Sequence, residues 1–275
     1  MSDWAALERE LDRWEEAGQP ATLWWRDDDA AARTAALDRL LDLAERHGLP
    51  LALAVIPQAA EAAPADGLAN GLAGRPADVR VLQHGFAHRN NAGPDAKKCE
   101  LVARALRPEI AGELRQGQAL LAALCGERLV PALVPPWNRI DADLVAALPA
   151  LGFTGLSTYK ARRLAEPVAG LRQVNCHVDI MQWRPQRRFL GTAAVLQLLV
   201  EHLEARRTGA ADPAEATGLL THHAVHDAEA WRFLEELLPR LAGHPASRFP
   251  PPDTLFAAPS GRVPASSPQS VSGAA

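Results

Sequence analysis

Residues 21–57 read ATLWWRDDDAAARTAALDRLLDLAERHGLPLALAVIP. The run at 21–25 is apolar and rich in β-forming residues, and it ends abruptly at four charged residues. Residues 33–47 repeat apolar side chains at helical spacing, and Gly48 follows at the position where glycine most often closes a helix. Residues 49–57 then form a second apolar run that a proline stops. The segment therefore predicts one strand–helix–strand unit.

The same alternation continues along the chain. The pattern predicts further strands at 79–83, 129–134, 153–157 and 216–221, and helices at 107–125, 141–151, 191–207 and 227–242. Strands that alternate with helices form a parallel sheet, and six or more such units favour a closed or nearly closed barrel. An open doubly wound sheet is the alternative, but no glycine-rich nucleotide turn follows the first strand. We therefore expect an α/β barrel.

Three segments differ in composition. Residues 1–20 contain an amphipathic helix, with apolar side chains three and four residues apart over 3–17. The alternating units occupy residues 21–243 and predict one barrel domain. Residues 244–275 are rich in proline, serine, alanine and glycine, which bury little apolar surface, and we expect a disordered tail there.

The overall charge excludes several classes of partner. The 275 residues include 29 Lys and Arg against 33 Asp and Glu, a net charge of -4, which favours neither nucleic acid nor an anionic membrane. No apolar run approaches the ~20 residues that span a bilayer. The three cysteines are far apart, so no disulfide framework is expected. The first residues are acidic and amphipathic and do not resemble a secretory signal, so we expect a cytoplasmic protein.

Three consecutive carboxylates, Asp27, Asp28 and Asp29, directly follow the first predicted strand. In parallel α/β folds, functional groups gather at the carboxyl ends of strands. Adjacent like charges repel and raise each other's pKa, so this group indicates a cation that neutralises it. The simpler interpretation is a solvated helix N-terminus.

Two histidines follow the strand predicted at 79–83. His84 and His88 are four residues apart, which predicts that both imidazoles lie on one side of a helical turn, as metal binding requires. Two histidines on a helix surface would give the same spacing.

Three more segments are unusual. His222, His223 and His226 follow the strand predicted at 216–221, a concentration that packing alone does not explain. Residues 134–138, VPPWN, could be a structural turn. Residues 175–183, NCHVDIMQW, could be an irregular strand with a buried tryptophan.

Taken in order, these segments resemble the five motifs of the polysaccharide deacetylase family, the chitooligosaccharide deacetylase homology domain of carbohydrate esterase family four. The matches are Asp28-Asp29, His84 with His88, Val134-Pro135-Pro136-Trp137-Asn138, Asp179 with Trp183, and Leu220-Thr221-His222. The resemblance covers about residues 21 to 242. It implies a distorted (β/α) barrel with about seven parallel strands.

The resemblance also implies a divalent metal, usually Zn²⁺, held by Asp29, His84 and His88. Two imidazoles and one carboxylate leave positions open for water and substrate, which is the pattern of a catalytic site. A metal there polarises an acyl carbonyl and acidifies water. The implied activity is a metal-dependent hydrolase that removes an acyl group, the acetyl group above all, from an amide nitrogen.

The resemblance assigns roles to further residues. Asp28 would be the general base, and His222 the general acid, oriented by Asp179. The arginine of the family's third motif is absent here, and Arg26 or Arg139 could replace it. The residues expected to line the substrate pocket are Pro136, Trp137, Asn138, Trp183 and His223.

Two assignments stay open at this stage. Asp27 and Asp28 could be the working pair in place of Asp28 and Asp29, and His223 could replace His222. The expected substrate is an oligosaccharide or another small N-acyl compound. The alternative function is a catalytically inactive relative that binds a carbohydrate or a protein partner.

Overall fold

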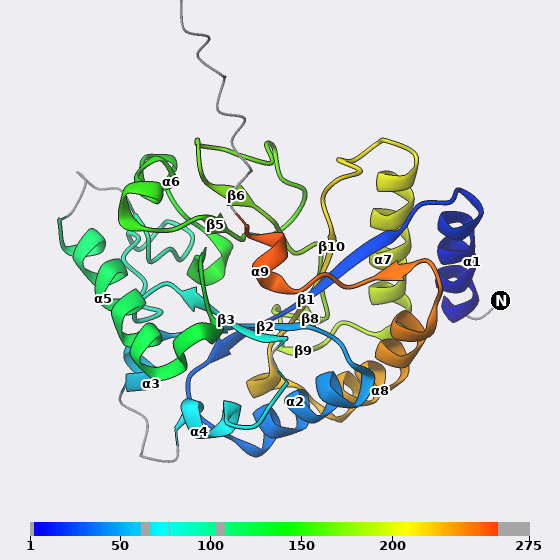
Figure 1. Cartoon of the computed structure of the whole chain (residues 1–275), viewed down its shortest axis with the longest axis horizontal. Coiled ribbons are helices and arrows are strands. Elements are labelled where there is room, and N and C mark those ends of the chain that lie inside the picture. Colours follow the sequence, from blue (N-terminus) through cyan, green and yellow to red (C-terminus); the bar gives the residue numbers. More distant parts are fainter. Residues whose placement is uncertain (1–2, 62–66, 77, 103–107, 258–275) are drawn as a thin grey trace, which may run out of the picture.

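The computed structural model describes residues 3–61, 67–76, 78–102 and 108–257. Its strands lie at the centre of the molecule (Figure 1). They are β1 (Ala21–Ala30), β2 (Leu51–Val55), β3 (Val79–His84), β4 (Leu129–Val134), β5 (Gly155–Leu156), β6 (Arg172–Gln173), β7 (Val178–Asp179), β8 (Met181–Gln182), β9 (Arg188–Phe189), β10 (Thr217–Thr221) and β11 (Ser247–Arg248).

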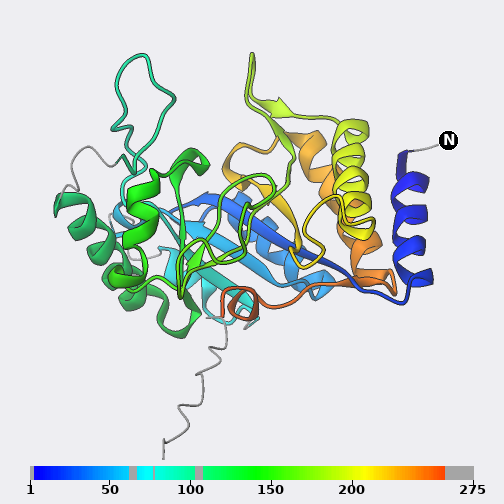
Figure 2. The ribbon, with the colours of Figure 1, turned by 90° about the horizontal axis from the view of Figure 1, so that it is seen from above.

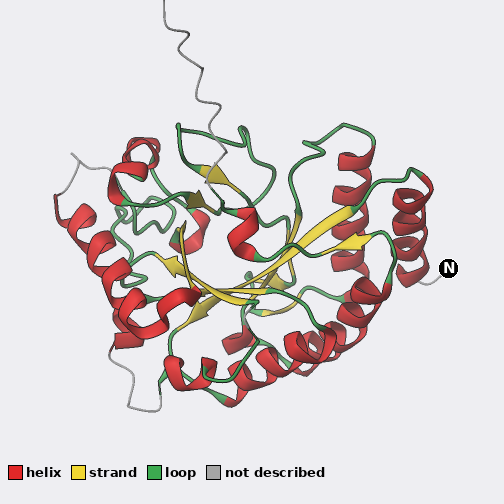
Figure 3. Cartoon of the chain, in the orientation of Figure 1, coloured by secondary structure: helices red, strands yellow, loops and turns green. Residues whose placement is uncertain are grey.

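Helices lie outside the strands over most of the molecule (Figure 3). They are α1 (Asp3–Glu16), α2 (Ala35–His47), α3 (Pro57–Glu61), α4 (Leu68–Leu72), α5 (Pro108–Cys125), α6 (Ala142–Ala147), α7 (Thr192–Arg207), α8 (Ala228–Gly243) and α9 (Pro252–Leu255). Short 3₁₀ helices are η1 (Gly126–Arg128), η2 (Pro136–Asn138), η3 (Pro149–Leu151) and η4 (His223–Val225). The long predicted strands and helices are thus confirmed, with ends that differ by a few residues.

The main sheet is a parallel half-barrel. Its strand order is β6-β5-β4-β3-β2-β1-β10-β7, and neighbours along this path pair in parallel. A parallel bridge also joins Tyr159, three residues after β5, to Cys176, two residues before β7. The predicted distorted (β/α) barrel is confirmed, and the path contains eight strands where about seven were expected.

Side chains alternate between the inside and the outside of this barrel, as they must along a strand. Trp24 points inward and packs with small residues of the neighbouring strands, Ala52 and Ala54 among them. Leu23 and Trp25 point outward and join the larger core beneath the helices. β1 is therefore buried on both faces, which explains its almost unbroken apolar start.

The amino-terminal helix is part of this core. α1 packs against α7 (Figure 1), and its buried face consists of Leu7, Leu11 and Trp14. The amphipathic pattern predicted over 3–17 thus covers one side of the barrel. No helix in the described ranges is long and apolar enough to cross a membrane.

The predicted disordered tail is wrong for residues 244–257. β11 pairs in parallel with the start of β1, and the ring of Phe256 is 1% exposed. Phe256 packs edge-on against Trp24, with the ring centroids 5.7 Å apart. One large aromatic anchor therefore orders a proline-rich segment whose average composition indicated disorder. Residues 258–275 of the predicted tail lie outside the described residues.

The two ends of the barrel differ. Seen from above, the loop after β3 and the β8–β9 hairpin rise from one side of the molecule, and α9 lies on the opposite side (Figure 2). The first side is the one where β1, β3 and β10 end. The polar residues identified in the sequence, among them Asp29, His84 and His222, lie at the strand ends and in the loops of that side.

Candidate active site

The alternation along β1 separates the first two aspartates. Arg26 and Asp28 follow Trp24 on the inner face of the strand, whereas Asp27 follows Trp25 on the outer face. The side chains of Arg26, Asp27 and Asp28 are all buried. Asp28 therefore faces the barrel interior and Asp27 does not.

Asp29 does not follow this alternation, because the strand is irregular at its end. The pairing register of β1 with β2 shifts between Asp27 and Ala30, and Asp29 has a φ of 67° in the left-handed region. Such a bulge re-aims one side chain and is common beside active sites. It allows Asp28 and Asp29, although adjacent in sequence, to contribute to one site.

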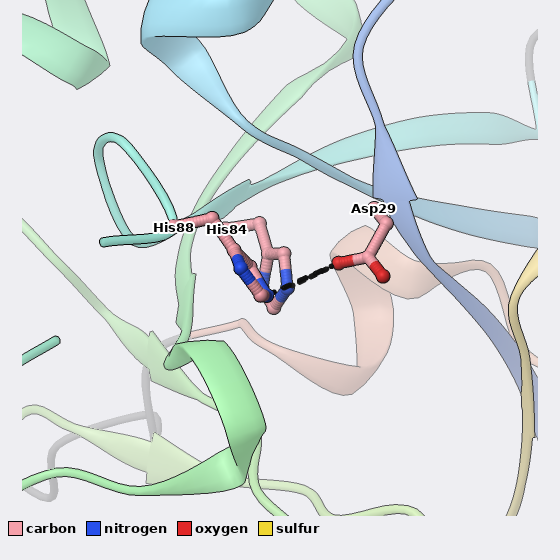
Figure 4. A group of neighbouring side chains, drawn as sticks. All are labelled: Asp29, His84 and His88. Carbon is pink, nitrogen blue, oxygen red and sulfur yellow. Dashed lines mark hydrogen bonds and ion pairs between the residues drawn. The ribbon is translucent and has the colours of Figure 1, made fainter. Parts of the chain in front are cut away.

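His84 and His88 come together with Asp29 (Figure 4). The Nε2 atom of His84 lies 3.1 Å from Asp29 Oδ1, and that of His88 lies 3.3 Å from the same oxygen. The predicted helical turn between the histidines is wrong. His84 ends β3, and a loop with positive φ at Gly85 and His88 brings the second ring back beside the first, 5.2 Å away between centroids.

These three side chains fit a divalent metal. One ligand atom from each lies within 4.8 Å of the others. The Nδ1 atom of His84 donates to the carbonyl oxygen of Val134 at 2.9 Å, which leaves the Nε2 lone pair free for a metal. Burial opposes the charge on Asp29, but the hydrogen bond and the charge of His84 hold the pKa of this carboxyl well below its usual range. The carboxyl is thus ionised whenever a metal could bind.

A buried glutamate shapes the loop that carries His88. Glu100 accepts backbone N–H bonds from Ala87 at 2.8 Å and Phe86 at 3.3 Å. Gly85 faces the same carboxylate, and a Cβ there would lie 2.0 Å from Glu100 Oε2. The close approach and the φ of 56° explain why position 85 is a glycine. No pattern in the sequence indicated this role of Glu100.

Arg26 and Asp28 form a buried, bidentate ion pair. Arg26 Nε lies 2.8 Å from Asp28 Oδ1, and Arg26 Nη2 donates to Asp28 Oδ2 at 3.0 Å. The guanidinium also donates to Asn138 Oδ1 at 2.7 Å and Ser157 Oγ at 2.6 Å. Arg139, the other candidate for this role, instead donates to the Lys98 carbonyl oxygen at the surface.

His222 lies between two carboxylates. Its Nε2 atom is 4.0 Å from Asp28 Oδ2, and its Nδ1 atom is 3.9 Å from Asp179 Oδ1. Both distances exceed a hydrogen bond. Trp183 donates from Nε1 to Asp179 at 2.7 Å and packs edge-on against the His222 ring. Burial raises the pKa of Asp179, although His222 and the Trp183 hydrogen bond oppose this.

His223 belongs to a separate pair on the outer side of β1. Its Nδ1 atom lies 2.5 Å from Asp27 Oδ1, and Asp27 Oδ2 accepts from its backbone N–H and from the Thr221 hydroxyl. The structure therefore does not bring His223 to the expected substrate pocket. It brings together Asp28 with His222, and Asp29 with the two histidines of the β3 loop.

Comparison with known proteins identifies the architecture. No protein-family model matches the sequence, and no curated protein matches it. A solved protein from Mycobacterium smegmatis assigned as a polysaccharide deacetylase is 16% identical, and the match covers 87% of this chain and 90% of that one with a TM-score of 0.60. The fold is that of the polysaccharide deacetylases.

Two further structures share this deacetylase fold. A peptidoglycan N-acetylglucosamine deacetylase is 12% identical over 88% of this chain and 91% of that one, with a TM-score of 0.56. A family 4 carbohydrate esterase from Streptomyces lividans, solved with acetate, is 16% identical over 82% and 90%, with a TM-score of 0.52. The resemblance inferred from the motifs is thus supported by a fold match over 82–88% of this chain.

A cleft of about 770 Å³ adjoins the site of this deacetylase fold. Asn138 and Thr158, which both accept from Arg26, line its wall together with Arg139 and Gln173. On the other side of Asn138, Trp137 packs against the His88 ring with centroids 4.4 Å apart. Pro136 is buried beneath this turn, and Trp183 is 43% exposed. Of the five expected pocket residues, Asn138 lines this cleft, and Trp137 and Trp183 pack against the rings of His88 and His222.

Proposed function

We propose that this protein is a metal-dependent deacetylase that hydrolyses the amide bond of an N-acetylated sugar or oligosaccharide. One observation carries the proposal. Asp28, held by Arg26, lies beside the group of Asp29 and its two histidines and 4.0 Å from His222. A candidate base, a candidate acid and a candidate metal site thus share one end of the barrel.

Asp29, His84 and His88 would hold the metal. Their donor set, two imidazoles and one carboxylate, suits Zn²⁺ and leaves room for further ligands. When bound, the ion supplies Lewis acidity to the acyl carbonyl and to the attacking water. Trp137 limits the mobility of the His88 ring by packing against it.

Asp28 would act as the general base. The hydrogen bond from Arg26 Nη2 and the close approach of Arg26 Nε keep the carboxyl group in place to take a proton from water. Both prongs of the guanidinium fix the orientation of the carboxylate, which is the role that the family's third-motif arginine has in the resemblance.

His222 would act as the general acid. It is buried, with Asp28 facing its Nε2 atom and Asp179 facing its Nδ1 atom. From this position it would give a proton to the departing amine. Asp179 is itself oriented by the Trp183 indole and by the backbone N–H of Met181.

Two features favour a sugar as the substrate. The solved structures with this fold include a deacetylase named for peptidoglycan N-acetylglucosamine. The adjoining cleft presents the amide and hydroxyl groups of Asn138, Thr158 and Gln173, which can bond sugar hydroxyls. The exposed indole of Trp183 offers a flat apolar face for a sugar ring.

The alternative function, that of a catalytically inactive protein that binds a carbohydrate or a protein partner, has less support. The missing third-motif arginine motivated it, and Arg26 forms the carboxylate contact that this loss would have removed. A protein that only binds carbohydrate also has no need for a grouped Asp29, His84 and His88.

The test is an acetate-release assay on metal-loaded protein with N-acetylated sugars, chitin oligosaccharides, amides and ureides. We expect turnover of at least one N-acetylated sugar, its loss with chelator, and its recovery with added Zn²⁺. His88→Ala should lose this recovery. Metal-loaded protein that hydrolyses no N-acyl compound would contradict the proposal and favour a binding role.

A further inference from the structure

Three histidines follow β10, and the proposed chemistry uses only the first of them. His222 is the proposed acid, and His223 pairs with Asp27 on the outer side of β1. His226 directly follows η4 and is partly buried beside Trp231, with the two rings nearly perpendicular and their centroids 4.7 Å apart. The contacts of His226 nevertheless lead back to His222.

The ring of His222 is not held by a hydrogen bond of its own among the described residues. Its Nδ1 atom is buried without a partner, and its Nε2 atom lies 4.0 Å from Asp28 Oδ2, too far for a hydrogen bond. Such a ring takes its position from packing, here against Trp183, and from its own backbone. Whatever fixes the backbone of His222 therefore fixes the position of the acid.

The backbone at His222 is irregular. β10 ends at Thr221 and η4 begins at His223, and His222 itself has φ −144° and ψ 80°, which belong to neither element. Its N–H lies past the last residue of the strand. A buried N–H at such a junction needs an acceptor from elsewhere, since the regular ladder of hydrogen bonds has ended.

Two side chains supply acceptors at this junction. The N–H of His222 donates to His226 Nε2 at 3.2 Å, and the N–H of His223 donates to Asp27 Oδ2 at 2.9 Å. The peptide groups on both sides of the His222 Cα atom are thus anchored. Asp27 also holds the His223 ring and so serves the fold more widely, whereas the contact with His222 is the one hydrogen bond of the His226 side chain among the described residues.

His226 is in the right state to accept this hydrogen bond. Nε2 can accept an N–H only when it carries no proton, so the ring must be neutral with its proton on Nδ1. Burial and the charges of His222 and His223 lower the pKa of His226 to about 4, although Asp27 opposes this. The Nδ1 atom is buried without a partner, which is destabilising. A side chain that served packing alone would avoid this penalty by having no polar atom.

We propose that His226 is a positioning residue, whose imidazole holds the backbone of His222 so that the acid stays between Asp28 and Asp179. The inference rests on the proposed function, in which His222 protonates the departing amine. It predicts a loss of kcat with little change in KM when the acceptor is removed, because other groups bind the substrate and the acid acts only on the leaving group.

The test compares acetate release by zinc-loaded, full-length wild-type, His226→Phe and His226→Gln proteins. His226→Phe keeps a ring beside Trp231 but has no acceptor, and its kcat should fall roughly 10- to 100-fold, the scale of a misplaced catalytic group, while KM stays within about twofold. His226→Gln should restore most of the loss, because its Oε1 atom is as many bonds from the backbone as Nε2. Zinc content and melting temperature should match the wild type, and His226→Leu replaces His226→Phe if the latter lowers the melting temperature.

Two further measurements separate positioning from packing. Trp231→Phe is the matched control, because it changes the packing beside His226 but keeps the acceptor, and its kcat should stay at the wild-type value. Hydrogen exchange of the His222 amide, followed by NMR, should be roughly tenfold faster in His226→Phe than in the wild type and close to the wild type in His226→Gln.

The outcomes distinguish this inference from the proposed function. If the wild type is active, then an unchanged kcat or unchanged amide exchange in His226→Phe, a His226→Gln protein as slow as His226→Phe, or an equal loss in Trp231→Phe overturns the inference and leaves the proposed function standing. An inactive zinc-loaded wild type contradicts the proposed function, and the role of His226 with it.

Discussion

Arg26 and Asp28, two residues apart on β1, form a buried ion pair in which Nε and Nη2 of the guanidinium each contact one carboxylate oxygen. The spacing of two is what makes the pair possible, because it puts both side chains on the inner face of the strand. In the polysaccharide deacetylase family, which the motifs resemble, the arginine beside the catalytic aspartate comes from the third motif, at the position that Val134 occupies here. The same contact is thus made from a new place in the sequence.

We expect Arg26→Gln to damage both stability and turnover. Removing one partner of a buried ion pair leaves a charge without compensation, which costs about 3–5 kcal/mol. Arg26→Lys should retain the charge but only one prong, so its fold should survive better while kcat stays low. Urea unfolding and acetate release measure the two effects. Arg139→Gln is the control, and a loss of turnover in this control equal to that of Arg26→Lys would contradict the role of Arg26.

The Asp27–His223 pair should affect stability more than chemistry. Burial alone would raise the pKa of Asp27 and lower that of His223, but each partner reverses this, so the pKa of Asp27 is lowered and that of His223 is raised. A lowered carboxyl pKa stabilises the fold above its unfolded value, and a raised imidazole pKa does so below its unfolded value. The contribution is therefore complete between about pH 4 and pH 6.5.

We accordingly expect Asp27→Asn to lower the free energy of unfolding by about 3 kcal/mol near pH 6, with a difference that shrinks as pH rises through the raised pKa of His223. Urea unfolding from pH 5 to pH 9 measures this. A difference that grows toward pH 9 would show that the pair does not act in this way.

His222→Ala should lower kcat by roughly two to four orders of magnitude, the scale of a lost general acid, and leave the fold intact. Asp179→Asn should have a milder effect, since Asp28 still faces the ring. Acetate release and the melting temperature of each variant measure these effects. Equal losses of turnover in His223→Ala protein that remains fully folded would move the acid to the neighbouring imidazole.

The alternation of side chains along β1 and β10 could have been used to predict which of the adjacent aspartates and histidines faces the barrel interior. Trp24, Arg26 and Asp28 alternate onto one face of β1, and His222, directly after β10, is two residues from the inward-facing Leu220. The five motifs predicted the fold and the Asp29 group for the same reason: their residues follow the strands at the same end of the barrel.

Other features had no local signal in the sequence. The bulge that re-aims Asp29 depends on the register between β1 and β2, and the role of Glu100 depends on a loop folding back over Gly85. Such features arise from tertiary packing, which composition and periodicity do not describe.

We expect the packing of the carboxyl-terminal segment to stabilise the fold. Phe256→Ala should lower the free energy of unfolding by about 3–5 kcal/mol, because the ring is buried against Trp24 inside the barrel. A chain that ends at residue 257 keeps this contact, and its melting temperature should match that of the full chain. Thermal unfolding compares the two. An unchanged melting temperature in Phe256→Ala protein would show that the segment adds nothing to the fold.

The most direct test of the central claim is acetate release from an N-acetylated sugar by zinc-loaded wild-type and Asp28→Asn proteins, with zinc content measured on the same samples. If Asp28 is the base beside the Asp29 site, Asp28→Asn should turn over roughly two to four orders of magnitude more slowly while its zinc content stays that of the wild type. Equal turnover by the two zinc-loaded proteins, or no turnover by the wild type, would contradict the account.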